Sequence, residues 1–242
     1  MGKIESGVGT LVATNERIDG AVNPAIDRLK DWLKQTQQNI HVDETPWLVK
    51  GIKEWLWIFG NTDAALFHGA DTRYRAELES ILGSSYSGVL SSDDDSADNG
   101  YPVKAQQKCL ANLRGHFKKL IKLPGLNNQE IGAWFISLLD EAFKNYALCQ
   151  QNQNSDEFLS RTSGFKLKVE TSIHSWMEQA GGEAGKLWRS RQKKSHQWWY
   201  FLDHPELSPD NNLAEGEVGA VTKKKLVEVA AQWSGSKILP IY

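Results

Sequence analysis

The hydrophobic pattern of the chain changes its period near Pro102, and this change limits the folds that it can adopt. Before it, short apolar runs bounded by turn residues predict strands over residues 40–42, 54–59, 64–68 and 87–91. Beyond it, apolar residues recur at helical spacing in four successive stripes. Strands early in the chain and an all-helical block after them predict an α/β fold, in which a sheet domain is interrupted by a helical insertion.

Helix and turn signals complete this pattern. Pro24 is expected to open a helix at its first turn, where proline fits well. A second helix is predicted over residues 71–82 and ends at Gly83, and a turn near residues 50–51 joins the first two strands. Strand 54–59 carries large apolar residues on both faces, which is typical of a central strand. The four helical stripes beyond Pro102 cover residues 109–121, 131–142, 158–177 and 187–201.

The composition is that of an ordinary globular protein, since 40% of the 242 residues are hydrophobic and 24% are charged. The two cysteines, Cys109 and Cys149, fit neither a disulfide framework nor a CxxC metal motif, and they suit a reducing compartment. Cys109 lies on a helical stripe and is expected to be a core residue. The chain has no run of about 18 apolar residues and no apolar export segment at its start, so we expect a cytoplasmic protein without a membrane span.

The charge is distributed unevenly, although its formal sum is only −2. Basic residues form three clusters, and four aspartates form an acidic group between residues 93 and 98. Basic surfaces around an acidic centre suit a polyanion held against bound cations. The alternative is that the basic runs are solvated helix faces. The candidate contacts to a polyanion are Lys104, Lys108, Arg114, Lys118 and Lys119, then Arg189, Arg191, Lys193 and Lys194, and finally Lys223, Lys224 and Lys225.

Three carboxylates from distant segments are the best candidates for chemistry. Asp43 and Asp93 each follow a predicted strand, and strand ends are the usual place for ligands in open α/β sheets. Glu215 falls at the capping-box position if Asn212 is the N-cap of a helix. Each acid also has a structural alternative: Asp43 as a turn residue, Asp93 as part of a polar acidic loop, and Glu215 as part of a helix cap. Converging carboxylates are the ligand set of a two-magnesium phosphoryl-transfer site.

The acidic group is a further place where a cation could bind, and other kinds of site have little support in the sequence. The acidic group, Asp93, Asp94, Asp95 and Asp98, would repel itself, and a bound cation would relieve the repulsion. The six histidines lack zinc-binding spacing. The chain also has no glycine-rich phosphate loop and no nucleophile-elbow motif.

Five short motifs, in order and at the expected rough spacing, resemble the insertion-sequence 66 family of DDE transposases. They are His41-Val42-Asp43-Glu44-Thr45-Pro46-Trp47, Glu54-Trp55-Leu56-Trp57, Gly88-Val89-Leu90-Ser91-Ser92-Asp93, Gln107-Lys108-Cys109-Leu110-Ala111 and Pro209-Asp210-Asn211-Asn212-Leu213-Ala214-Glu215. Five motifs in register are far more specific than any one of them, and the resemblance spans residues 5–225.

The resemblance implies a ribonuclease-H-like mixed sheet and metal-assisted cutting and joining of transposon-end DNA. It implies that Asp43 and Asp93 bind two Mg²⁺ ions, for which Mn²⁺ can substitute, and that Glu215 completes one ion's shell. The implied partner is DNA, held by the basic clusters, and the protein is expected to be a homo-oligomer on DNA at the bacterial nucleoid. The implied domains are a helical lead-in (1–38), a catalytic core (39–122 and 205–225), a helical insertion (123–204) and a divergent tail (226–242).

The chain also departs from the family pattern. The family usually has histidine at Asn112, arginine at Gly216 and an aromatic residue at Asp98. The resemblance ends after Lys225, and the parts expected to read the DNA ends do not precede the core. The sequence therefore indicates a truncated transposase core. Its rivals are an inactive remnant that only binds DNA, a host nuclease of the same fold, and a helical scaffold in which the three acids do not meet.

Overall fold

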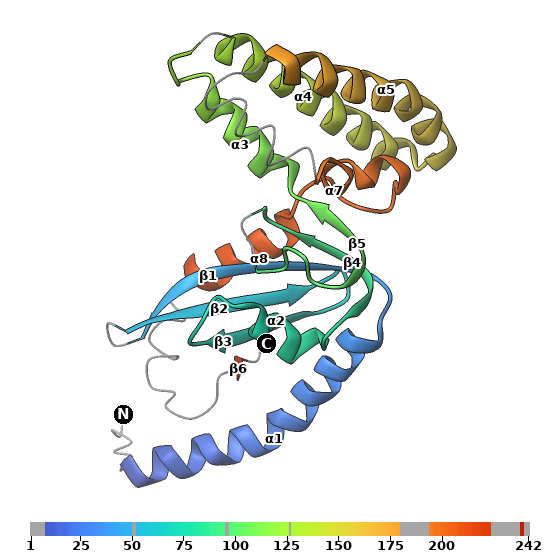
Figure 1. Cartoon of the computed structure of the whole chain (residues 1–242). Helices are drawn as coiled ribbons and strands as arrows, with labels where there is room; N and C mark the ends of the chain where they lie inside the picture. The colour runs from blue at the N-terminus through green and yellow to red at the C-terminus, as the bar shows by residue number, and fades with distance from the viewer. Residues whose placement is uncertain are drawn as a thin grey trace, which may run out of the picture.

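The computed structural model describes residues 8–49, 52–94, 97–125, 127–179, 194–223 and 238–239, which form a mixed α/β fold (Figure 1). The strands are β1 (Asn39–Val49), β2 (Ile52–Gly60), β3 (Ala65–Ala70), β4 (Tyr86–Ser92), β5 (Val103–Lys108) and β6 (Ile238–Leu239). The helices are α1 (Val8–Gln35), α2 (Arg75–Leu82), α3 (Leu110–Leu120), α4 (Asn128–Asn152), α5 (Ser155–Gln179), α7 (Ser195–Trp198), the 3-10 helix η1 (Tyr200–Asp203) and α8 (Asn212–Lys223).

The strands form one mixed sheet in the order β5-β4-β1-β2-β3-β6. β1, β2 and β3 are antiparallel neighbours, whereas β4 pairs parallel with β1 and β5 pairs parallel with β4. Val49 pairs with Ile52, and the turn predicted near residues 50–51 lies outside the described residues. The end of β4 therefore lies between β1 and the edge strand β5.

The two faces of the sheet are covered by different helices, and β2 shows why. Trp57 and Phe59 are buried in a cluster with residues of α1 and α2. Leu56 and Ile58 point to the opposite face and pack in a cluster with Ala214 of α8. Because side chains alternate across a strand, both faces of β2 are buried. The prediction of a central strand is therefore confirmed.

A separate helical block follows β5, at the top of Figure 1. Its core joins α3, α4, α5 and η1, and the rings of Phe117 and Phe135 stack there with centroids 5.0 Å apart. The chain returns from this block to α8, so helices do lie between β5 and the last helix of the core. Within the described residues, the fourth predicted stripe forms two short pieces, α7 and η1, and its part before residue 194 lies outside them.

The prediction that only helices follow Pro102 is wrong for β5. Its sequence, VKAQQK, is polar and lacks an apolar alternation, yet its last three residues are buried. Hydrogen bonds make this possible, because Gln106 donates to the Asp98 carbonyl (2.9 Å) and Gln107 donates to the Trp198 carbonyl (3.1 Å). Buried amides that are hydrogen-bonded cost little, so a strand can form without an apolar stripe.

The prediction that Pro24 opens a helix is also wrong, since α1 already begins at Val8 and Pro24 lies inside it. Val22 and Ile26 pack on either side of Pro24 against the sheet, and this packing outweighs the lost backbone hydrogen bond. The end of α2 is as predicted, because Gly83 adopts φ +87° and its N–H donates to the Glu79 carbonyl. None of the described helices is long and apolar enough to span a membrane.

Candidate active site

The register of the parallel strands brings the predicted acids together. His41 of β1 pairs with Ser91 of β4, and Asp43 and Asp93, each two residues beyond this pair, are close enough to interact electrostatically. Ser92 pairs with the last residue of β5, which sets Cys109 beside Asp93 on the other side. Carboxyl ends of adjacent parallel strands lie at one edge of a sheet. Asp43, Asp93 and Cys109 therefore lie in one row, across β1 and the ends of β4 and β5.

Asp43 does not follow the end of a strand, as the sequence pattern predicts, but lies inside β1. The strand continues to Val49 because its second half pairs with β2, and Asp43 pairs there with Ile58. Ile40 and Val42 are buried on the face that α1 and α2 cover, so the alternation of β1 turns Asp43 to the opposite face. That face is covered by α8, which packs against β1 and β2 and carries Glu215 in its first turn.

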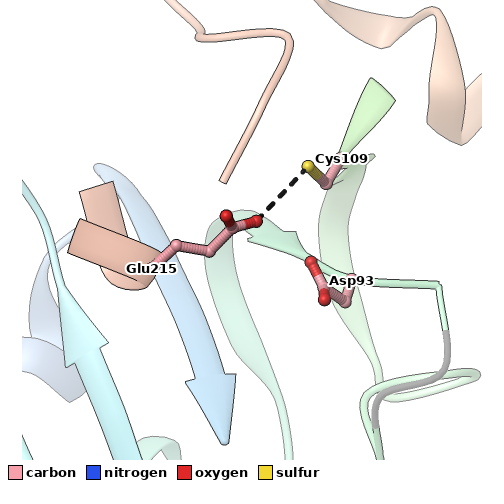
Figure 2. Close-up of side chains that lie close together, drawn as sticks. All are labelled: Asp93, Cys109 and Glu215. Carbon is pink, nitrogen blue, oxygen red and sulfur yellow. Dashed lines mark hydrogen bonds between the residues drawn. The ribbon is translucent and has the colours of Figure 1, made fainter. Parts of the chain in front are cut away.

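Asp93, Cys109 and Glu215 form a compact cluster. One ligand atom from each lies within 4.8 Å of those of the other two, and Cys109 Sγ is 3.8 Å from Glu215 Oε1. Figure 2 shows Glu215 reaching from α8 towards Cys109, with Asp93 below them after β4. Asp43 is not a member of this group of three. It lies close enough that the charges of Asp93 and Glu215 both raise its pKa.

The electrostatics of the site are those of crowded carboxylates. Burial raises the pKa of Asp43 to about 6, and repulsion from Asp93 and Glu215 adds to this effect. Burial also raises the pKa of Glu215, again with repulsion from Asp93. Burial raises the pKa of the Cys109 thiol to about 12, so the sulfur is protonated at neutral pH in the described chain. A cation between these groups would relieve the repulsion.

Asn211 links the elements that carry the site. Its side-chain N–H donates to the Val42 carbonyl (2.9 Å), and its Oδ1 lies 3.0 Å from His41 Nδ1. Its backbone N–H donates to Cys109 Sγ at 3.4 Å. Its carbonyl accepts the Glu215 N–H at 3.1 Å, which makes Asn211 the N-cap residue of α8. The capping box predicted from Asn212 is therefore wrong by one residue, and Glu215 is free of that structural role.

A positively charged side chain, Arg73, also acts on Asp43. Arg73 Nε donates to Glu44 Oε1 at 2.7 Å, and its guanidinium lies 5.3 Å from the centre of the Trp55 ring. Its positive charge lowers the pKa of Asp43 against the larger effect of burial. Burial raises the pKa of Glu44 to about 7, although Arg73 opposes this. The Arg73–Glu44 pair thus fixes the strand next to Asp43.

Two members of the acidic group after β4, Asp94 and Asp98, form ion pairs with lysines of the chain itself. Lys108 and Asp98 form a fully buried ion pair at 2.9 Å, and Lys108 Nζ also donates to the Asp93 carbonyl at 3.0 Å. Lys194 Nζ lies 3.8 Å from Asp94 Oδ1. A bound cation is therefore not needed to relieve the repulsion at Asp94 and Asp98. Lys108 is 0% exposed, so this predicted DNA contact cannot reach a DNA backbone in the described conformation.

The other predicted DNA contacts differ in their surroundings. Lys104 is exposed on β5, and Lys118 and Lys119 are exposed in the last turn of α3. Arg114 of α3 is paired with Asp140 of α4. Lys223 ends α8, but its side chain is not described. Arg189, Arg191, Lys193, Lys224 and Lys225 lie outside the described residues.

The sequence pattern missed Cys109, Asn211 and Arg73 as members or supports of the site. Cys109 is buried, as predicted, but its thiol faces acids instead of a hydrophobic core. The signal that could have found Cys109 is its place directly after β5. That signal was hidden, because the polar sequence of β5 does not predict a strand. The oxygens of Asp43, Asp93 and Glu215 are the donors that Mg²⁺ prefers, so the carboxylates fit that ion. A thiol is not a usual magnesium ligand.

Comparison with known proteins identifies the family. The model of the transposase IS66 family matches residues 4–237, which is nearly the whole chain, and it extends beyond Lys225, where the resemblance of the motifs ends. No curated protein and no solved structure matches the chain. The matched region contains every residue of the acid cluster and the strands and helices that carry it. The chain therefore belongs to the transposase IS66 family.

Proposed function

We propose that this chain is a DDE-type catalytic core that cleaves and joins DNA at transposon ends with the help of divalent metal ions. One observation carries the proposal: Asp43, Asp93 and Glu215 come from segments up to 172 residues apart and repel one another electrostatically. Crowding carboxylates without a cation costs free energy. Their shared position is therefore best explained by a function that uses the negative charge.

The fold that we propose is ribonuclease-H-like. Its support is the order of the strands, in which three antiparallel strands, β3-β2-β1, are continued by the parallel strands β4 and β5. The proposed division of the chain is a lead-in (1–38), a core (39–122 and 205–225), an inserted helical unit (123–204) and a tail (226–242).

Asp43, Asp93 and Glu215 are the proposed metal ligands. Two divalent ions, when bound, would activate the attacking hydroxyl and stabilise the leaving oxygen of an in-line phosphoryl displacement. The chain itself positions the ligands: β1 fixes Asp43, and Asn211 joins β1 to the start of the helix that bears Glu215. Lys108 holds the backbone of Asp93 through its carbonyl. These supports are buried and hydrogen-bonded, which favours a preorganised site.

The proposed substrate is DNA, and the family membership supports this. Lys104, Lys118 and Lys119 are exposed and not matched by nearby acids in the sequence between residues 104 and 129. Such lysines suit contacts to DNA phosphates. We further propose that the chain acts as a homo-oligomer on DNA in the bacterial cytoplasm, since both ends of a transposon must be cut.

The test is nicking of supercoiled plasmid by the metal-free chain after addition of Mn²⁺ or Mg²⁺. We expect nicked product with the wild type and its loss, by at least about a hundredfold, with Asp43→Asn, Asp93→Asn and Glu215→Gln, because each removes a ligand charge. Asp31→Asn, an exposed acid on α1, is the matched control and should nick like the wild type.

The outcomes separate the proposal from its rivals. DNA binding without nicking would indicate an inactive remnant. Nicking without joined products, when a transposon-end oligonucleotide and a target plasmid are supplied, would indicate a nuclease. Wild-type nicking by all three variants would overturn the assignment of the acids.

A further inference from the structure

Cys109 occupies the one-residue junction between β5 and α3, with its sulfur inside the acid cluster. Its backbone N–H donates to the Ser92 carbonyl at 3.0 Å, directly before Asp93, so the residue is anchored to the end of β4. The residue is 1% exposed, yet its Sγ lies 3.8 Å from Glu215 Oε1 and within 4.8 Å of a carboxylate oxygen of Asp93 (Figure 2).

Hydrophobic packing does not explain this position. Among the described residues, Cys149 is part of the apolar core of the helical block, whereas Cys109 belongs to none of the three apolar clusters. Its sulfur instead accepts the Asn211 N–H at 3.4 Å and faces two carboxylates. The chain thus offers two buried cysteines with opposite surroundings, one apolar and one polar.

The distances suit a metal ion that accepts sulfur as well as oxygen. Around a tetrahedral zinc ion with Zn–S near 2.3 Å and Zn–O near 2.1 Å, two ligand atoms stand about 3.6 Å apart. The separation of 3.8 Å between Cys109 Sγ and Glu215 Oε1 is close to this value. The other separations in the cluster are at most 4.8 Å, so side-chain displacements of about 1 Å would bring them to this value.

We propose that Asp93, Cys109 and Glu215 form a site for a soft divalent cation, Zn²⁺ or its analogue Cd²⁺, and that this cation excludes Mg²⁺ from the proposed catalytic position. The inference rests on the proposed function, because it uses two of the same carboxylates. On binding, the S–H bond of Cys109 breaks, its proton passes to the solvent, and a sulfur lone pair forms the bond to the cation. Thiolates favour zinc over magnesium, whereas carboxylates alone do not discriminate in this way.

The first experiment titrates the metal-free chain with Cd²⁺ and follows the ultraviolet charge-transfer band of a cadmium–thiolate bond. We expect the band in the wild type and in Cys149→Ser, which is the matched control, and no band in Cys109→Ser. Calorimetry with Zn²⁺ should show a loss of affinity of at least about tenfold for Cys109→Ser, equivalent to about 1.4 kcal/mol. The affinity of the same variant for Mg²⁺ should stay within about threefold of the wild type.

A band that persists in Cys109→Ser, or its absence from the wild type, would overturn the inference. Cadmium NMR of the wild type gives a test that needs no variant, because the resonance position reports whether a sulfur ligand is present. In nicking assays, Zn²⁺ should inhibit the wild type at lower concentrations than it inhibits Cys109→Ser, when the rate of each form is compared with its own rate in Mg²⁺ alone. If no form of the chain nicks DNA but the cadmium–thiolate signal depends on Cys109, the proposed function fails and the metal site stands.

Discussion

At the scale of single residues, Asp43 shows the electrostatic cost of the site. Burial together with Asp93 and Glu215 raises its pKa to about 6, well above the ordinary value of 3.8. Arg73 offsets only part of this effect. A carboxylate retained under such conditions lowers the stability of the metal-free fold, which is a frequent property of functional sites.

This cost gives a prediction for Asp43→Asn in the metal-free chain. The folded state binds a proton at Asp43 more tightly than the unfolded state, so the free energy of unfolding should fall as pH rises from about 4 to about 6. At pH 7 the variant should be more stable than the wild type by roughly 1–2 kcal/mol, after allowance for solvent screening, and at pH 4 the two should be equal. Urea unfolding in EDTA at both pH values measures this.

Asp31→Asn serves as the control for that measurement, because Asp31 is exposed on α1 and should change stability by less than about 0.5 kcal/mol. Addition of Mg²⁺ should stabilise the wild type and not the Asp43→Asn chain. A variant that is less stable than the wild type at pH 7 would mean that Asp43 is a structural hydrogen-bond acceptor.

At the scale of secondary-structure elements, α8 has a local weakness beside the site. It carries Glu215, but the next residue is Gly216, and a side chain added there would meet no atom within 4 Å. Glycine in a helix interior costs about 1 kcal/mol relative to alanine, because the unfolded chain has more freedom. The helix therefore holds Glu215 less firmly than its length suggests.

Gly216→Ala should raise the free energy of unfolding by about 0.5–1 kcal/mol in urea unfolding. Gly132→Ala in α4 is the contrasting variant, since its new methyl group would meet Ile121 and would lie 3.1 Å from the Phe117 carbonyl. Overpacking of this kind should lower stability by about 1–3 kcal/mol. Equal effects of the two substitutions would contradict the packing described for α8.

The same scale shows what the sequence can and cannot predict. β2, β4 and the end of α2 were predictable, because apolar runs and Gly83 are local signals. β5 was not, since its buried polar side chains are satisfied by partners outside the strand: Gln106 and Lys108 bond to Asp98, and Gln107 bonds to the distant Trp198 carbonyl. Asp43, Asp93 and Glu215 were named from motifs. Cys109 needed the register of β4 against β5, and pairing between distant segments leaves no local pattern.

At the scale of the whole molecule, the chain has a formal charge of −2 and must bind a polyanion through local surfaces. α3 begins directly after Cys109 and carries Lys118 and Lys119 in its last turn. At 1.5 Å per residue, the two lysines lie about 14 Å along the helix from the acid cluster. DNA bound at the cluster would cover this distance in about four base pairs, at 3.4 Å each. Figure 1 places α1 on the opposite side of the sheet.

This arrangement predicts which lysines determine the salt dependence of DNA binding. Substituting both Lys118 and Lys119 by alanine should weaken binding to a duplex oligonucleotide, and it should reduce the slope of log affinity against log salt concentration by up to about 1.8, or 0.9 for each lost phosphate contact. Lys34→Ala, an exposed lysine at the end of α1, is the control and should leave the slope unchanged. Fluorescence anisotropy in Ca²⁺ measures both. An unchanged slope in the double variant would mean that these lysines contact no DNA. Their role would then be to stabilise the solvated end of α3 by a favourable interaction with the helix dipole.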